Sequence, residues 1–105
     1  PDGHRLAYSV EDSVVIVDIR RATTQVIHPP QRGRLVRTPA VSPDGTRVLF
    51  QVYGDGAWLL DVASGAMHRV LGDRTAEEFA WSPDGHRVAY HARRNGRWSL
   101  WQLPI

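Results

Sequence analysis

The stretch SPDGTRVLF, at positions 42–50, decides the fold of this chain because it returns twice more. It reads SPDGHRVAY at positions 82–90, and the chain opens on PDGHRLAY at positions 1–8. Aligning the copies on Pro1, Pro43 and Pro83 gives periods of 42 and 40 residues. Five further positions then match in kind in all three copies: Asp2, Asp44 and Asp84; Gly3, Gly45 and Gly85; Arg5, Arg47 and Arg87; Leu6, Val48 and Val88; Tyr8, Phe50 and Tyr90. Such a repeat indicates one structural unit per period.

Each copy contains the residues of a tight turn between two β-strands. Proline fixes φ at the first central position, the aspartate can bond nearby backbone, and glycine takes the left-handed conformation of the exit. Further turns are predicted at Asp55-Gly56, at Asn95-Gly96, at residues 61–67 and, more loosely, at residues 18–25. The segments between these turns are rich in Val and aromatic residues and predict ten strands: residues 6–10, 14–19, 24–28, 38–42, 47–52, a segment around Trp58, 67–71, 78–82, 87–92 and 98–103.

The period and the strand count predict an all-β fold of four-stranded antiparallel propeller blades, for which about 40–45 residues per repeat is typical. We predict an incomplete blade at residues 1–36, a full blade at residues 37–76 and an incomplete blade at residues 77–105, which is about two and a half blades. Propellers close with about four to eight blades. We therefore expect a partial propeller, a fragment of a longer one, whose open faces are covered by further blades or by another copy of the chain.

The aromatic-Ser-Pro-Asp-Gly pattern resembles a known family. The segments AVSPDGTRVLFQVYGDGAWLLDVASG and FAWSPDGHRVAYHARRNGRWSLWQL are similar to the WD-like (PD40-type) repeat of TolB-type propellers and of the propeller domains of prolyl oligopeptidase-like enzymes. The resemblance spans nearly the whole chain. It departs at Val41, where Trp81 shows the usual aromatic residue. The resemblance implies a propeller fold and favours a periplasmic or extracellular location.

Composition excludes several classes of function. The chain has no cysteine, so disulfides, thiolate metal sites and a cysteine nucleophile are excluded. All 13 basic residues are arginine, but the net charge is only +2. Arg32, Arg34 and Arg37 form the nearest thing to a basic cluster, which we interpret as a charged loop, so we expect no nucleic-acid partner. No apolar run is long enough for membrane insertion and no signal peptide is visible.

No catalytic, cofactor-binding or metal-binding residue is predicted. Ser42 and Ser82, with Asp44 and Asp84 two residues on, suggest part of a hydrolytic triad, but groups that recur once per repeat at a turn are interpreted as structural. Gly54-Asp55-Gly56 is interpreted as a hairpin tip, since a calcium loop needs more oxygen ligands. The five histidines lack the spacing of metal ligands: His4, His28, His68, His86 and His91.

The repeated arginines and the tryptophans are interpreted mainly as joints between blades. Arg5, Arg47 and Arg87 occupy one position in successive copies, so we expect them to bond neighbouring blade backbone or acidic groups rather than a ligand. Trp81 and Trp98 are predicted to lie in the core between blades, whereas Trp101 is left as either packed or exposed.

These observations favour a non-enzymatic scaffold that binds a protein or peptide partner and needs no cofactor. We expect its ligand surface in the loops at residues 28–37 and 72–78. The alternative, implied by the resemblance, is the substrate-gating propeller of a prolyl oligopeptidase-like serine hydrolase, whose nucleophile would lie on another domain because this chain has no G-x-S-x-G elbow. A sugar-binding or sugar-degrading propeller is a third possibility.

Overall fold

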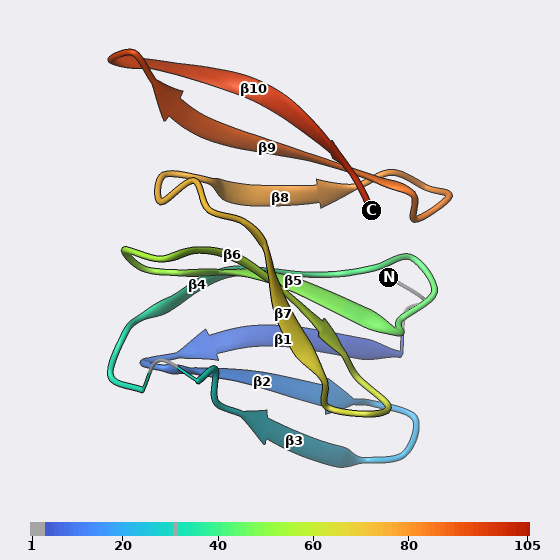
Figure 1. The fold of residues 1–105 in the computed structure, drawn as a ribbon. Coiled ribbons are helices and arrows are strands. Elements are labelled where there is room, and N and C mark those ends of the chain that lie inside the picture. The colour runs from blue at the N-terminus through green and yellow to red at the C-terminus, as the bar shows by residue number, and fades with distance from the viewer. Residues whose placement is uncertain (1–3, 31) are drawn as a thin grey trace.

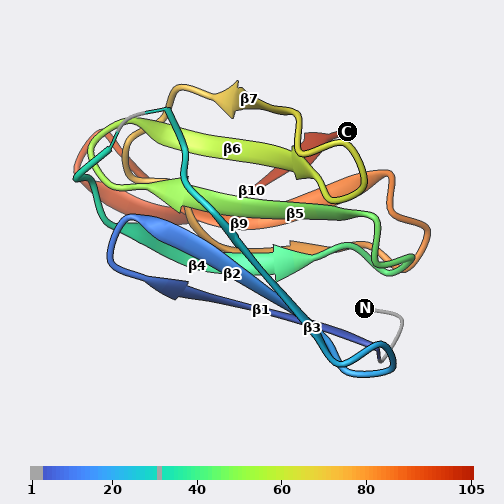
Figure 2. The ribbon, with the colours of Figure 1, turned by 90° about the horizontal axis from the view of Figure 1, so that it is seen from below.

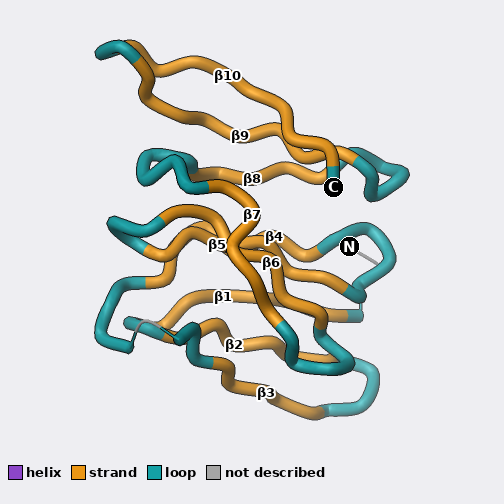
Figure 3. The backbone as a smooth tube through the Cα atoms, in the orientation of Figure 1, coloured by secondary structure: helices purple, strands orange, loops and turns teal. Residues whose placement is uncertain are grey.

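The computed structural model describes residues 4–30 and 32–105, which form ten strands in three antiparallel sheets and, within these residues, no helix (Figures 1 and 3). The first sheet consists of β1 (Arg5–Val10), β2 (Ser13–Asp18) and β3 (Thr23–Ile27). The second consists of β4 (Val36–Val41), β5 (Arg47–Val52), β6 (Gly56–Asp61) and β7 (Met67–Leu71). The third consists of β8 (Glu77–Trp81), β9 (Arg87–Arg94) and β10 (Arg97–Pro104).

The predicted all-β antiparallel class is confirmed, and the ten expected strands are all present. The strands follow one another in chain order across each sheet, so β4 and β7 are the edge strands of the second sheet (Figure 2). The edge strand β4 also lies against both neighbouring sheets, with β1 on one side and β8 on the other.

Consecutive antiparallel strands place alternate connections at opposite ends of the sheets. One end, which we name the turn end, carries the Ser-Pro-Asp-Gly turns at residues 42–46 and 82–86 (right in Figure 1). The other, which we name the loop end, carries the connections at residues 28–35, 53–55, 72–76 and 95–96 (left in Figure 1). The two loops predicted to form a ligand surface therefore begin on the same end of the molecule.

The first strands of the second and third sheets contain the same irregularity. The register shifts between Arg37 and Ala40 in one sheet and between Glu77 and Ala80 in the other. Thr38 and Glu78 lie within these bulges with positive φ angles of 50° and 58°. A bulge bends its strand and increases the local twist, so the repeat extends to backbone detail at positions where the two sequences differ.

Alternation along β5 builds the core on both sides of the second sheet. Val48 and Phe50 pack with Val14 of the first sheet in one buried cluster. Leu49, between them in sequence, packs with Tyr90 of the third sheet in another cluster. Successive side chains of a strand point to opposite faces, so one apolar strand joins all three sheets and fixes their stacking.

Candidate functional site

The Ser-Pro-Asp-Gly turn looks most like an active site in the sequence, and its geometry is that of a joint. The Ser42 hydroxyl donates to Asp44 Oδ1 at 2.7 Å and accepts from the Arg47 backbone N–H at 3.0 Å. Hydrogen bonds from Ser42 and Thr46 lower the pKa of Asp44 to about 2. A carboxylate with such a low pKa is a weak base and does not activate a hydroxyl near neutral pH. Ser42, fully buried, therefore stabilises the turn.

The third copy repeats this network. Ser82 Oγ donates to Asp84 Oδ1 at 2.6 Å and accepts from the Arg87 N–H at 3.0 Å. The Ser82 hydroxyl bond, with that of the His86 N–H, lowers the pKa of Asp84. The corresponding residues of the first copy, Pro1, Asp2 and Gly3, lie outside the described residues.

Two of the histidines lie beside carboxylates. His28 Nδ1 is 3.5 Å from Asp12 Oδ1, and His91 Nδ1 is 3.4 Å from Glu78 Oε2. Over residues 4–30 and 32–105, no group of three or more His, Asp or Glu side chains could hold a metal ion. Asp55, predicted at a hairpin tip, accepts a hydrogen bond from Trp58 Nε1 at 2.7 Å in the turn between β5 and β6.

Joints between sheets were predicted for all three repeated arginines, and two of them form such joints. Arg5 donates to the Gly45 carbonyl of the second sheet's turn, and Arg47 donates to the Gly85 carbonyl of the third sheet's turn at 2.8 Å. A guanidinium bound to a backbone carbonyl makes a charge-assisted hydrogen bond. Arg87, at the same position in the third copy, is exposed and has no side-chain hydrogen bond or ion pair within the described part of the chain.

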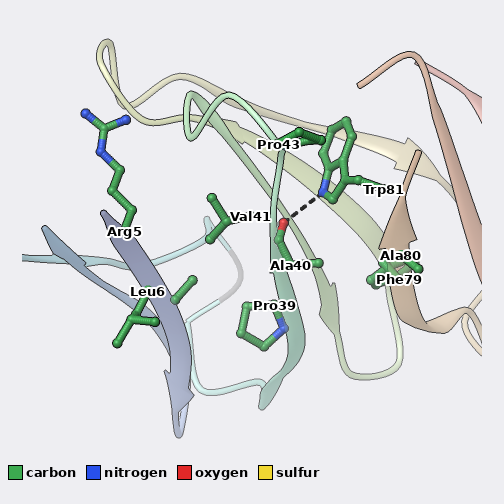
Figure 4. A pocket seen from close by; sticks show the side chains of 10 residues that line it. Arg5, Leu6, Pro39, Ala40, Val41, Pro43, Phe79, Ala80 and Trp81 are labelled. Atoms are coloured by element: carbon green, nitrogen blue, oxygen red, sulfur yellow. Dashed lines mark hydrogen bonds between the residues drawn. The ribbon is translucent and has the colours of Figure 1, made fainter. Parts of the chain in front are cut away.

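Trp81 completes the joint between the second and third sheets. Its indole Nε1 donates to the Ala40 carbonyl at 2.9 Å (Figure 4), and the Arg47 guanidinium lies 4.8 Å from its ring centroid. The prediction that Trp81 lies between blades is confirmed. The surrounding hollow, of about 340 Å³, is lined by residues of β1, β4 and β8 and by Pro43.

The same prediction for Trp98 is wrong, because its side chain is 55% exposed. The β9–β10 hairpin is longer than the β5–β6 hairpin, so Trp101, not Trp98, stands opposite the third-sheet aromatic, just as Trp58 stands opposite Phe50. The Arg94 guanidinium lies over the Trp101 ring, 3.9 Å from the ring centroid. The signal was present in sequence, since three more residues separate Tyr90 from Trp101 than separate Phe50 from Trp58.

A hollow of about 320 Å³ at the loop end is lined by residues from both segments that were predicted to form a ligand surface. We name it the loop-end groove. It includes Arg37, which belongs to the segment predicted at residues 28–37 and lies in β4, and Arg74 from the segment predicted at residues 72–78. Sequence reasoning missed most of its other members. Its lining residues are Arg37, Gln51, Tyr53, Gly54, Arg74, Thr75, Glu77 and Trp98.

The walls of the loop-end groove combine aromatic and cationic side chains. Tyr53 and Trp98 are each 55% exposed, and the Arg37 guanidinium lies 5.3 Å from the Tyr53 ring centroid. Gln51, buried at this site, donates Nε2 to the Arg74 carbonyl at 3.4 Å. The groove thus presents aromatic rings and positive charge, and the Gln51 hydrogen bond holds the Arg74 backbone beside them.

The loops beside the groove are held by two aspartates. Asp12 accepts from Arg32 Nε and from the Gly33 N–H, each at 3.0 Å, and these bonds, the backbone bond foremost, lower its pKa to about 2. Burial raises the pKa of Asp73, but hydrogen bonds from Thr75 and Arg94 outweigh it and the net shift is downward.

The predicted basic cluster is divided among several partners. Arg32 pairs with Asp12, Arg34 donates to the Tyr53 carbonyl at 3.2 Å, and Arg37 lies over the Tyr53 ring. These arginines therefore support the loop and the groove wall instead of forming one continuous cationic surface. The described residues contain no helix that is long and apolar enough to cross a membrane.

Comparison with protein-family models finds no match, and comparison with curated proteins finds none either. Solved structures are similar. TolB from Acinetobacter baumannii is 18% identical with a TM-score of 0.81, over 96% of this chain and 28% of that one. The β-propeller domain of the trilobed protease from Pyrococcus furiosus is 15% identical with a TM-score of 0.76, over 97% of this chain and 37% of that one.

The acylaminoacyl peptidase of Pyrococcus horikoshii is 19% identical with a TM-score of 0.63, over 87% of this chain and 15% of that one. The chain thus spans well under half the length of these proteins. These similarities and the three stacked antiparallel sheets show a TolB-like β-propeller fold.

Proposed function

We propose that this chain is a non-catalytic segment of a longer TolB-like propeller and binds a protein or peptide partner through the loop-end groove. The observation that carries the proposal is the pairing of two half-exposed rings, Tyr53 and Trp98, with Arg37 in one hollow. Aromatic residues and arginine contribute most of the binding energy at protein interfaces. The polar groups of the repeat, by contrast, are used in turns and joints.

The groove favours an extended peptide with an apolar and an acidic side chain. Tyr53 and Trp98 offer ring faces for the apolar group, and the guanidinium groups of Arg37 and Arg74 offer charge-assisted bonds to a carboxylate. Glu77 lies in the same lining, so a ligand with uniform negative charge fits less well. The resemblance to TolB-type propellers further favours a periplasmic or extracellular setting.

The test is selection of random 12-residue peptides on phage against the purified chain, followed by titration of the selected synthetic peptides. Tyr53→Ala and Trp98→Ala should each weaken binding about tenfold, as expected when a well-packed anchor is truncated. Tyr8→Ala is the matched control, because Tyr8 is 48% exposed on the first sheet, away from the groove. Equal losses in Tyr8→Ala and Tyr53→Ala contradict the proposal.

A second candidate is the propeller part of a prolyl oligopeptidase-like serine hydrolase. The similarity to the acylaminoacyl peptidase favours it. The discriminating observation is the sequence beside this segment in its gene: a G-x-S-x-G elbow with a downstream Asp and His supports the hydrolase. Hydrolysis of a peptide substrate by the purified 105-residue chain itself contradicts a non-catalytic segment.

A further inference from the structure

The outward face of the third sheet repeats a surface that the second sheet uses to hold its neighbour. Arg47 binds the Gly85 carbonyl and lies over Trp81, both in the adjoining sheet. Arg87 is the repeat equivalent of Arg47, and Ala80 is the equivalent of Ala40, whose carbonyl accepts from Trp81. The third sheet therefore carries the same arginine and the same carbonyl position.

A hollow of about 270 Å³ lies beside Arg87, with Ala80 and Ala89 in its lining. These three residues are the equivalents of Arg47, Ala40 and Leu49, which meet the third sheet in the joint that Trp81 completes. The hollow is thus the repeat equivalent of the site where Trp81 packs on the second sheet. Its position and size suit an indole ring.

Two further differences leave this face suited to a partner. Arg5 and Arg47 stand opposite Asp18 and Asp61 in their sheets, whereas Arg87 stands opposite Pro104. Leu100 is 70% exposed, although Ala57, which holds the corresponding register position, is fully buried. The guanidinium thus has no cross-strand carboxylate, and Leu100 adds exposed apolar surface to the same face.

We infer that this face, defined by Ala80, Arg87, Ala89 and Leu100, docks a Trp-Ser-Pro-Asp-Gly turn of an adjoining repeat of the same type. Arg87 donates to the carbonyl of the incoming glycine, and the incoming indole enters the hollow and donates to the Ala80 carbonyl. The inference rests on the proposal that the chain is part of a longer propeller, and it names the residues that recognise the next unit.

Over residues 4–30 and 32–105, a second copy of this chain does not offer the same partner. Its Trp81 already donates to its own Ala40 carbonyl, and its other described Ser-Pro-Asp-Gly turn follows Val41 instead of an aromatic residue. The occupant is therefore a repeat with an uncommitted Trp before the turn. The contact is heterologous, since turn and receiving face are different surfaces.

The test extends the chain by one repeat in register. Ile105 N donates to the His86 carbonyl as Val62 N donates to the Thr46 carbonyl, each at 2.9 Å. Ile105 thus corresponds to Val62, and residues 1–105 followed directly by a second copy of residues 63–105 continue the pattern. The added Trp81 and its turn then face Arg87 of the original segment.

Arg87→Ala in the original segment should lower the melting temperature of the extended chain by roughly 3–6 °C, as expected for loss of a charge-assisted hydrogen bond in a chain of this size. The matched control is the same substitution in the added copy, where that arginine faces solvent. Equal effects of the two substitutions overturn the inference.

A second measurement does not depend on destabilisation. Because the chain has no cysteine, Ala89→Cys provides a single thiol whose labelling rate reports access to the hollow. The rate should fall about tenfold in the extended chain, while Val26→Cys, on an exposed residue of β3, should label at an unchanged rate. An unchanged rate at Ala89→Cys overturns the inference.

The inference is also overturned if the labelling rate of Ala89→Cys in the 105-residue chain falls as the protein concentration rises, because a second copy of the chain then covers the face. The experiments on this face can fail without contradicting the proposed function, because the two proposals are tested with different variants and measurements. Peptide binding at the loop-end groove is measured with Tyr53→Ala, and Arg87 does not line that groove.

Discussion

The Arg47 guanidinium lies 4.8 Å from the Trp81 ring centroid, across the boundary between the second and third sheets. The same arginine also donates to the Gly85 carbonyl, four residues beyond that tryptophan. One side chain therefore fixes both the aromatic residue and the turn of the next repeat. This pairing explains why the arginine, the glycine and the turn recur together in sequence.

We expect Trp81→Ala to lower the free energy of unfolding by about 2–4 kcal/mol, because it removes a partly buried ring together with its hydrogen bond to the Ala40 carbonyl. Trp98→Ala is the control, since that ring is 55% exposed, and its effect should stay below about 1 kcal/mol. Urea unfolding of the two variants measures the difference. Equal losses contradict the joint described for Trp81.

Stability should decline in acid partly through Asp44. Its pKa in the folded chain, about 2, lies below the ordinary value of 3.8, because it accepts hydrogen bonds from Ser42 and Thr46. A group with a depressed pKa stabilises the fold above its unfolded-state pKa and loses that contribution as pH falls through the folded value. The loss attributable to Asp44 should therefore run from about pH 4 down to about pH 2.

Asp44→Asn should reduce the steepness of this acid decline, and the urea midpoint measured between neutral pH and pH 2 checks it. Glu11→Gln is the control, because Glu11 is exposed and takes no part in the Ser-Pro-Asp-Gly turns. If Glu11→Gln changes the slope as much as Asp44→Asn does, the turn network is not its source.

The strands and turns could be predicted from sequence because they depend on local chemistry that is repeated. The turn at Pro43, Asp44 and Gly45 depends only on these residues, and alternation along β5 indicates which side chains share a face of the sheet. The Arg47 joint followed from the same repetition, since a residue that recurs once per unit has an equivalent neighbour in each.

The rest of the candidate site depends on how units meet. Trp98 follows its hairpin turn just as Trp58 does, but its hairpin is longer, so Trp98 stands opposite Arg93 and lies at the loop-end groove. Gln51 lies within an apolar strand and gave no sequence signal. Its position in the groove follows from the stacking of sheets, which local patterns do not encode.

Ser42→Ala should cost about 1–3 kcal/mol of unfolding free energy, because the Arg47 N–H loses its acceptor at a fully buried hydroxyl. The matched substitution, Ser82→Ala, should cost less, since the same bonds there are exposed to water. Urea unfolding compares the two variants. A cost for Ser82→Ala equal to or above that for Ser42→Ala contradicts the argument from burial.

Gly56→Ala should be among the most destabilising single substitutions in the second sheet. Gly56 has a φ of +144°, and a Cβ there would lie 2.2 Å from the Leu71 carbonyl oxygen, where backbone on both sides prevents relaxation. Gly65→Ala provides the comparison, because Gly65 also has a positive φ, +75°, but a Cβ there would meet nothing within 4 Å.

Gly65→Ala should lower the free energy of unfolding only by the conformational cost, about 1 kcal/mol. Gly56→Ala adds a steric overlap, so its loss of unfolding free energy should exceed about 2 kcal/mol. Thermal and urea unfolding of both variants measure the two costs. Because Gly56 begins β6 and Leu71 ends β7, separation of these strands in Gly56→Ala should also speed amide exchange in β7. Equal stabilities in the two variants show that the β6–β7 pair is looser at this end than the described register requires.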